Sequence, residues 1–261
     1  MTSSNNDQIR QIVRENYRQV AVREDDCCGP SCGCQAEPEE LSQLMGYTLE
    51  EIQAVPGGAN MGLGCGNPQA IASLQPGEVV LDLGSGGGFD CLLAARQVGP
   101  TGQVIGVDMT PEMISKARRI AREMGVEHVE YRLGEIEHLP VADASVDVIL
   151  SNCVINLSPE KEQVFREAFR VLKPGGRLAI SDIVTSAPLP PEVRQDMTLY
   201  TECVAGAASV NELEAMLARI GFVDVAIRPK EESRTLIRVW ELGGNLDDYI
   251  LSATIQARKP A

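Results

Sequence analysis

The residues of this chain with the greatest capacity for chemistry are its eight cysteines. Cys153, in SNCVINLSP, follows an apolar run at the place where an α/β enzyme turns the end of a strand toward its substrate. Cys65 lies in the glycine-rich stretch NMGLGCGNP, and Cys203 lies in LYTECVAGA further along the chain. Thiolates select soft Lewis acids, and three of them can hold trivalent arsenic in a pyramid that leaves its lone pair free. These three thiols are therefore candidates for one soft, three-coordinate centre.

The other five cysteines suggest different roles. Cys91, in FDCLLAARQV, is expected inside a helix that packs on the sheet, where a thiol is usually a small core residue. The remaining four form the cluster CCGPSCGC, at Cys27, Cys28, Cys32 and Cys34. Structural zinc sites usually pair two cysteine knuckles about a dozen or more residues apart, so this tight spacing favours metalloid capture or thiol exchange over zinc.

A second chemical site is indicated by the glycine stretch LDLGSGGGF. Its glycines permit a tight turn and a close approach of a ligand to the backbone, although a purely structural turn is the alternative. Asp82 precedes the glycines, and Asp108 ends the next expected strand, where an acid can accept both hydroxyl groups of a ribose. A carboxylate before the glycines repels the pyrophosphate of NAD, whereas it suits the amino-acid end of S-adenosylmethionine. The pattern therefore favours S-adenosylmethionine over NAD.

Strand-like and helix-like segments alternate in an order that brings these residues together. Strands are expected at EVVLDL, QVIGVDM, VEYRL, VDVILSN and GRLAISDIV, with single helices between them. We predict an α/β fold with a doubly wound, mainly parallel, Rossmann-like sheet whose carboxyl ends carry the site. Thr110 is expected to cap a helix that begins at Pro111, and Asn67 to cap a short helix that begins at Pro68.

Extensions flank this alternation on both sides. A helix is predicted over residues 7–23, because apolar residues recur there at near-helical spacing. Beyond Pro188 we expect a helix near ELEAMLARIGF and a strand-like piece at TLIRVWEL. The predicted organisation is an N-terminal helix and cysteine-rich extension over residues 1–60, a donor-binding domain over 61–187, and a small C-terminal α+β portion over 188–261 that completes the thiol site.

Composition argues against several classes of function. The net charge is −14 and no basic cluster is present, so nucleic acids and anionic membranes are poor partners. No apolar run is long enough for a membrane span, and the start MTSSNNDQIR lacks the apolar stretch of a signal peptide. We therefore expect a soluble, cytoplasmic protein whose thiols stay reduced. Both histidines, His128 and His138, are expected at the surface or in loops, which leaves little room for imidazole catalysis.

The segments VLDLGSGGG, VIGVDM, LGEIEHLP and VLKPGGRLAISD resemble the class I S-adenosylmethionine-dependent methyltransferases. This resemblance implies that Asp82 and the turn after it lie near the methionine part of the donor, and that Asp108 holds the ribose. It also implies that residues 134–136 border the adenine. The donor-binding residues implied in this way are Asp82, Gly84, Ser85, Gly86, Asp108, Met109, Gly134, Glu135, Ile136 and Asn152.

Two longer segments, GANMGLGCGNPQAIASLQPGEVVLDLGSGGGFDC and VDVILSNCVINLSPEKEQVFREAFRVLKPGGRLAISDIV, resemble the arsenite methyltransferases in particular. By this resemblance Cys65, Cys153 and Cys203 are the catalytic, arsenic-binding residues. The cluster from Cys27 to Cys34 falls where the family has a further cysteine, and which of its four thiols matches is open. The implied reaction moves methyl groups from S-adenosylmethionine to thiol-bound trivalent arsenic, as arsenic detoxification, with thioredoxin or glutathione as the thiol reductant.

Two other functions remain open on the sequence. A methyltransferase that acts on carbon in a quinone-like or sterol-like acceptor would share the donor fold. A non-catalytic metalloid-binding protein would keep the cysteines without using a donor. Analysis of the products formed from arsenite, a thiol and S-adenosylmethionine distinguishes these alternatives.

Overall fold

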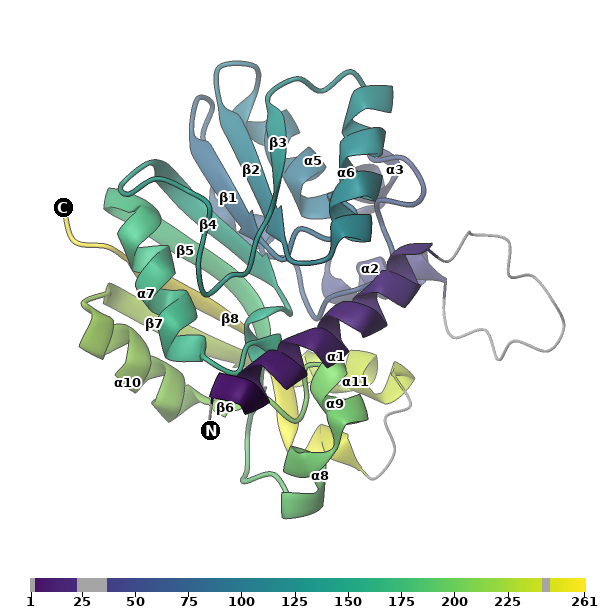
Figure 1. The fold of residues 1–261 in the computed structure, drawn as a ribbon, viewed down its shortest axis with the longest axis vertical. Coiled ribbons are helices and arrows are strands. Elements are labelled where there is room, and N and C mark those ends of the chain that lie inside the picture. Colours follow the sequence, from purple (N-terminus) through teal and green to yellow (C-terminus); the bar gives the residue numbers. More distant parts are fainter. Residues whose placement is uncertain (1–2, 23–36, 241–244) are drawn as a thin grey trace, which may run out of the picture.

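The computed structural model describes residues 3–22, 37–240 and 245–261, and its centre is one sheet with helices on both faces (Figure 1). Successive residues of the first strand show how the two faces are used. Leu81 belongs to one buried apolar cluster together with Phe165, whereas Val80 belongs to a second cluster together with Leu92. Because side chains alternate across a strand, these clusters lie on opposite faces of the sheet.

The strand order is β3-β2-β1-β4-β5-β8-β7, and a short β6 pairs with β5 beside this path. Neighbours are parallel from β3 to β5, while β8 is antiparallel to both β5 and β7. The strands are β1 (Val79–Leu83), β2 (Gln103–Asp108), β3 (Val129–Leu133), β4 (Val146–Asn152), β5 (Leu172–Thr185), β6 (Ala208–Ser209), β7 (Val223–Lys230) and β8 (Ile250–Arg258). The predicted doubly wound, mainly parallel sheet is confirmed for the described part of the chain.

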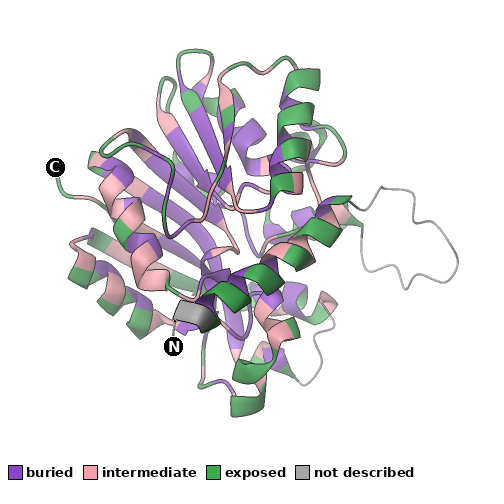
Figure 2. Ribbon diagram, viewed as in Figure 1, coloured by how far each residue is buried: buried purple, intermediate pink, exposed green. Residues whose placement is uncertain are grey.

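Helices connect the strands and cover the sheet. They are α1 (Ser3–Val22), α2 (Pro38–Met45), α3 (Leu49–Gln53), α4 (Gln69–Ala72), α5 (Phe89–Val98), α6 (Pro111–Glu123), α7 (Lys161–Val171), α8 (Pro191–Gln195), α9 (Met197–Thr201), α10 (Val210–Ile220) and α11 (Arg234–Val239). Three 3-10 turns complete the list: η1 (Ile155–Leu157), η2 (Glu231–Ser233) and η3 (Leu246–Asp248). Figure 2 shows the central strands largely buried, the edge strand β7 partly exposed, and the outer faces of the helices exposed.

Two predicted helix starts have different outcomes. Thr110 precedes α6 and Pro111 is its first residue, as expected, although the Thr110 side chain forms no capping hydrogen bond. Before α4 the prediction is wrong by one residue, because Pro68 itself occupies the capping position. Asn67 still supports this helix, since its side-chain oxygen accepts a hydrogen bond from the backbone N–H of Ala70 at 3.2 Å.

The strand predicted at TLIRVWEL is also wrong. Its described residues up to Val239 belong to α11, and the last antiparallel pair is made by β7 and β8 instead. The β-branched residues favoured a strand, but burial of Leu236 and Ile237 against the apolar clusters outweighs that local preference. The turn before α11 is fixed by Ser233, whose hydroxyl group donates to the carbonyl of Lys230 at 2.6 Å and accepts from the N–H of Ser252 at 2.9 Å.

Helix α1 lies across the carboxyl ends of the parallel strands and contacts both α6 and α9 (Figure 1). It begins at Ser3, four residues before the predicted start at residue 7. The residues after Pro188 supply β7 and β8, which extend the same sheet through β5. The division at residues 60 and 187 stays a prediction. Within the described residues, no helix is long and apolar enough to cross a membrane.

Candidate active site

A cavity of about 400 Å³ lies at the carboxyl ends of the central parallel strands. Its wall is formed by the turns after β1, β2 and β4, by α1, and by the loop before Cys65. Trp240, at the end of α11, also lines it. The predicted donor-binding residues on this wall are Asp82, Gly84, Ser85, Gly86, Asp108, Met109, Gly134, Ile136 and Asn152.

Glu135 is the exception among the predicted donor residues, because it does not line the cavity. Its carboxylate pairs with Arg14 at 3.1 Å and with Arg10 at 3.7 Å, and both arginines belong to α1. The neighbouring acid, Glu137, lines the cavity in its place and is buried.

The turn after β1 requires glycine at position 84. The φ angle of Gly84 is 68°, in the left-handed region, and an added Cβ atom would stand 2.5 Å from a methyl carbon of Val154. The N–H groups of Gly84 and Ser85 both donate to the carbonyl of Val107, at 2.8 and 3.0 Å. The turn is thereby tied to the end of β2, where Asp108 follows.

Three carboxyl groups line the cavity, and those of Asp82 and Asp90 are buried whereas Asp108 is half-buried. Asp108 accepts hydrogen bonds from the N–H groups of Gly86 at 3.0 Å and Thr110 at 2.8 Å. Burial raises the pKa of Asp82, Asp90 and Asp108, and at Asp82 the neighbouring charge of Asp90 adds to the effect. Such a group of acids favours a ligand that brings positive charge.

Two observations indicate that a polar ligand belongs in this cavity. The hydroxyl group of Ser85 is buried on the wall and has no hydrogen-bond partner among the described residues. The carboxylate of Asp108 keeps acceptor capacity beyond its two backbone donors. S-adenosylmethionine, with an ammonium group, a sulfonium centre and ribose hydroxyl groups, matches this combination of anions and free polar atoms.

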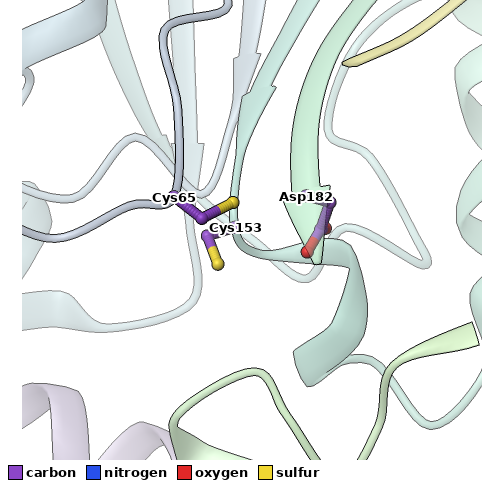
Figure 3. Close-up of side chains that lie close together, drawn as sticks. All are labelled: Cys65, Cys153 and Asp182. Atoms are coloured by element: carbon purple, nitrogen blue, oxygen red, sulfur yellow. The ribbon is translucent and has the colours of Figure 1, made fainter. Parts of the chain in front are cut away.

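The thiols lie where the cavity meets the end of β4. The Sγ atoms of Cys65 and Cys153 and a carboxylate oxygen of Asp182 all lie within 4.8 Å of one another (Figure 3). Cys203 is next to them, and its thiol donates to the carbonyl oxygen of Cys153 at 2.7 Å. Among the described residues, the Sγ atom of Cys203 is not within 4.8 Å of both other thiol sulfurs. The structure therefore brings the three predicted cysteines into one place, with Cys203 turned toward the backbone.

Two of these cysteines have strained backbones. The φ angles are 56° at Cys153 and 62° at Cys203, a region that residues other than glycine rarely adopt. Such a conformation costs about 1 kcal/mol or more. A side chain retained at this cost indicates a use for the thiol, and strained positions cluster at functional sites.

The environment favours the protonated form of Cys153 and Cys203. Hydrogen bonds with the thiols of Cys203 and Cys65, together with burial, raise the pKa of Cys153 well above its usual value. The hydrogen bond to Cys153 lowers the pKa of Cys203, but burial and the charge of Asp182 reverse the shift, so the net change is upward. Burial raises the pKa of Asp182 itself to about 6.

Asn152 joins the thiol site to the acidic part of the cavity. Its side-chain oxygen accepts from the N–H of Cys65 at 3.0 Å, and its NH₂ group donates to the carbonyl of Gly66 at 2.7 Å and to the hydroxyl of Tyr47 at 3.1 Å. Tyr47 in turn donates to Asp90 at 2.9 Å. Glycine is needed at position 64, because a Cβ atom there would lie 2.8 Å from the Asn152 amide.

Helix α1 closes the outer side of the cavity through charged contacts. Arg10 pairs with Glu137 at 3.2 Å and also with Glu160. Val13 is fully buried, and the Tyr17 hydroxyl donates to the carbonyl of Thr201 at 3.3 Å. The periodicity of α1 predicts a helix, but nothing in the local sequence predicts that this helix covers the site.

The remaining predicted residues lie elsewhere. Cys91 is fully buried in α5, and its thiol donates to the carboxylate of Asp82 at 3.3 Å, so it does more than fill space. His128 contacts the carbonyl of Ala95 at 3.0 Å, and neither histidine lines the cavity. Cys27, Cys28, Cys32 and Cys34 lie outside the described residues.

Sequence reasoning missed Asp182, Asp90 and Tyr47. The sequence contains a signal for Asp182, because this acid interrupts the apolar run of the predicted strand GRLAISDIV. In the structure the preceding residue, Ser181, pairs with Asn152, which places Asp182 near the thiol site. Asp90 and Tyr47 gave no such signal, since one lies in the first turn of a helix and the other in a loop.

Comparison with known proteins agrees with the geometry of this cavity. A family model described as a methyltransferase domain matches residues 74–221. The arsenite methyltransferase of Halobacterium salinarum is 53% identical over 264 residues, which cover 98% of this chain and 68% of that protein. The human arsenite methyltransferase is 36% identical, over 82% of this chain and 58% of its own length.

A solved structure has the same architecture. The crystal structure of an arsenic (III) S-adenosylmethionine methyltransferase from Chlamydomonas reinhardtii aligns with a TM-score of 0.60 and 32% sequence identity. The alignment covers 87% of this chain and 75% of that one. The resemblance therefore extends over most of this chain.

Proposed function

Because the chain belongs to the arsenite methyltransferase family, we propose that it transfers methyl groups from S-adenosylmethionine to trivalent arsenic held by Cys65, Cys153 and Cys203. The observation that carries this proposal is the meeting of Cys65 and Cys153 at the edge of the acidic cavity, joined to it through Asn152. A soft acceptor site and a site for a cationic donor thus share one wall.

The donor is held by the acidic part of the cavity. Asp108 receives the ribose hydroxyl groups, and the carboxylates of Asp82 and Asp90 balance the positive charge of the ligand. Ser85 offers the free hydroxyl group described above, and the glycines of the turn allow close approach of the backbone. When bound, S-adenosylmethionine supplies an electrophilic methyl group and a neutral leaving sulfur.

The acceptor is loaded by ligand exchange at the thiols. Each new As–S bond breaks one As–O bond of arsenous acid and one S–H bond, and the thiol proton leaves with the hydroxide as water. The raised pKa values of Cys153 and Cys203 favour their protonated form before loading, so exchange at these two thiols needs no net proton transfer to solvent. Cys203 must turn its sulfur from the carbonyl of Cys153 toward the other two thiols to complete a three-sulfur site.

The chain contributes alignment and exclusion of water to the transfer step. Asn152 fixes the Cys65 loop relative to the donor cavity through three hydrogen bonds. Helix α1 covers the cavity with Arg10, Val13 and Tyr17, which limits access of water to the reacting groups.

Turnover requires electrons, because methylation formally oxidises arsenic to the pentavalent state. We assign their supply to thioredoxin or glutathione acting through cysteine pairs, and the arsenic capture or thiol exchange role to Cys27, Cys28, Cys32 and Cys34. A cytoplasmic location, where thiols stay reduced, suits this cycle. Detoxification of arsenic is its expected purpose.

The proposal is tested by separating the products formed from arsenite, glutathione and methyl-labelled S-adenosylmethionine. Label in methylated arsenic is the expected result. Label in an added quinone with none in arsenic would instead support a carbon methyltransferase. Arsenite binding without any binding of S-adenosylmethionine would support a sequestering protein.

A further inference from the structure

The third member of the cluster in Figure 3 is a carboxylate, and a soft three-sulfur arsenic site has no need of an oxygen ligand. Asp182 lies on β5 and is 2% exposed. It belongs to no salt bridge in the part of the chain that the structure describes. Burying a carboxylate without a salt bridge is costly for folding, and the charge of nearby Lys161 offsets only part of this cost, since the pKa of Asp182 stays raised.

The carboxylate is held rigidly, with its charge directed at the thiols. One of its oxygens accepts from the Asn156 side chain at 2.9 Å and the N–H of Ile183 at 2.8 Å. The other accepts from the N–H of Ile155 at 3.0 Å, at the start of η1. These donors stabilise the anion without neutralising it, and they fix its place beside Cys65 and Cys153.

The chemistry of methyl transfer explains why a fixed anion is useful there. The arsenic lone pair forms the new As–C bond while the C–S bond of the sulfonium breaks, and the bonding electrons of that bond stay on sulfur. One unit of positive charge therefore leaves sulfur and arises on arsenic. An anion that already faces the arsenic position lowers the energy of this change without reorganising.

We propose that Asp182 accelerates methyl transfer electrostatically, by stabilising the positive charge that develops on arsenic bound to the neighbouring thiols. This inference rests on the proposed function and assigns Asp182 a role other than that of an arsenic ligand. The competing explanation is structural: Asp182 would only hold η1 and the Cys153 loop in place.

The test uses Asp182→Asn, which keeps the shape of the side chain and removes its charge. Protein loaded with arsenite is mixed with S-adenosylmethionine at a saturating concentration, and the rate of the first methyl transfer is followed in a single turnover. We expect this rate to fall about ten- to a hundredfold, with both dissociation constants within about threefold of the parent values.

A matched control is Asn156→Ala, which removes one hydrogen bond to Asp182 and leaves the charge. We expect this variant to lose stability to urea but to keep most of its transfer rate. Equal losses of rate in Asn156→Ala and Asp182→Asn would overturn the electrostatic role and leave the structural one. If Asp182→Asn does not fold, Asp182→Ser replaces it, since serine also removes the charge and its hydroxyl can still accept from one of the three donors.

A binding measurement gives a readout that does not depend on turnover. Three thiolates give cadmium a complex with one negative charge and trivalent arsenic a neutral one, so an anion beside the thiols disfavours bound cadmium. With serine at positions 27, 28, 32 and 34, Asp182→Asn should therefore strengthen cadmium binding, followed by thiolate-to-metal absorption, about tenfold while arsenite binding is retained. Weaker cadmium binding would instead identify Asp182 as a metal ligand and overturn the inference. Unchanged cadmium affinity and an unchanged transfer rate would refute the inference. A parent protein that does not methylate arsenite would refute the proposed function instead.

Discussion

The backbone is strained at two neighbouring cysteines of the site, Cys153 and Cys203. In both, the left-handed backbone would suit glycine better than any residue with a side chain. Glycine would therefore give the more stable backbone, whereas only cysteine supplies the thiol. Substitutions at these positions can thus change the free energy of unfolding and the activity in opposite directions.

A comparison of Cys153→Gly with Cys153→Ala makes the separation measurable. Glycine relieves the backbone strain, so the glycine variant should be more stable to urea than the alanine variant by about 1 kcal/mol. Neither variant should methylate arsenite, since both lack the thiol.

Cys91 provides the matched control for this comparison. It lies in the first turn of α5 with an ordinary helical backbone, where glycine is less favourable than alanine by up to about 1 kcal/mol. At position 91 the alanine variant should therefore be more stable to urea than the glycine variant, the reverse of the order at position 153. The same order at both positions would contradict strain at Cys153.

The ribose contact is the residue-level test of the donor site. Asp108→Ala should weaken S-adenosylmethionine binding about ten- to a hundredfold in calorimetric titration, because hydrogen bonds to a carboxylate are lost. Arsenite binding should be retained. Asp143→Ala, which removes an exposed acid away from the cavity, is the control and should leave donor affinity unchanged.

At the level of elements, the parallel strands were predictable and the parts that cross over them were not. Runs such as VVLDL and VIGVD have the apolar continuity of buried parallel strands. The acid at or next to the end of each run therefore lies at the carboxyl edge of the sheet. The position of α1 depends on Arg10 meeting Glu137, a residue far along the chain, and no local pattern encodes such a contact. The same holds for α11, where burial outweighed the preference of its β-branched residues for a strand.

The charged contact of α1 can be tested directly. Arg10→Met should loosen the helix, because Glu137 is buried and loses its charged partner. We expect S-adenosylmethionine to bind about tenfold more weakly and the backbone amides of α1 to exchange hydrogen faster.

Arg18→Met is the control for this change. Arg18 is exposed, and its described contacts are with Glu15 on the same helix. Donor affinity and exchange in α1 should then stay near the parent values. Equal effects of the two substitutions would show that α1 does not cover the donor through Arg10.

At the level of the whole molecule, the chain has a net charge of −14, and some of its acidic residues, such as Asp82 and Asp90, are buried in the cavity. The raised pKa values of Asp82, Asp90 and Asp108 mean that the folded protein binds protons more readily than the unfolded chain. Their contribution to stability is therefore present at low pH and is lost as the pH rises from about 4 through the raised values. A cationic ligand compensates for this loss by favouring the ionised acids.

This linkage predicts the pH dependence of donor binding. S-adenosylmethionine should bind more weakly at about pH 5.5 than at about pH 7, a range in which its ammonium group stays charged, because protonation of the cavity acids removes the charge that attracts it. Adenosine, which has neither the sulfonium nor the ammonium group, should show a smaller change in the same titrations. A similar pH dependence for both ligands would argue against charge balance by the cavity acids.

The position of Trp240 has an optical consequence. It is the one tryptophan of the chain, it lines the cavity, and it packs beside the apolar cluster that contains Cys65. The protein therefore carries its own fluorophore at the site, and excitation of the indole group reports on that place alone. Binding of a heavy atom should quench the indole fluorescence, and entry of a ligand should shift its emission wavelength. Stopped-flow fluorescence of the unlabelled protein can therefore show the order in which the donor and the metalloid bind.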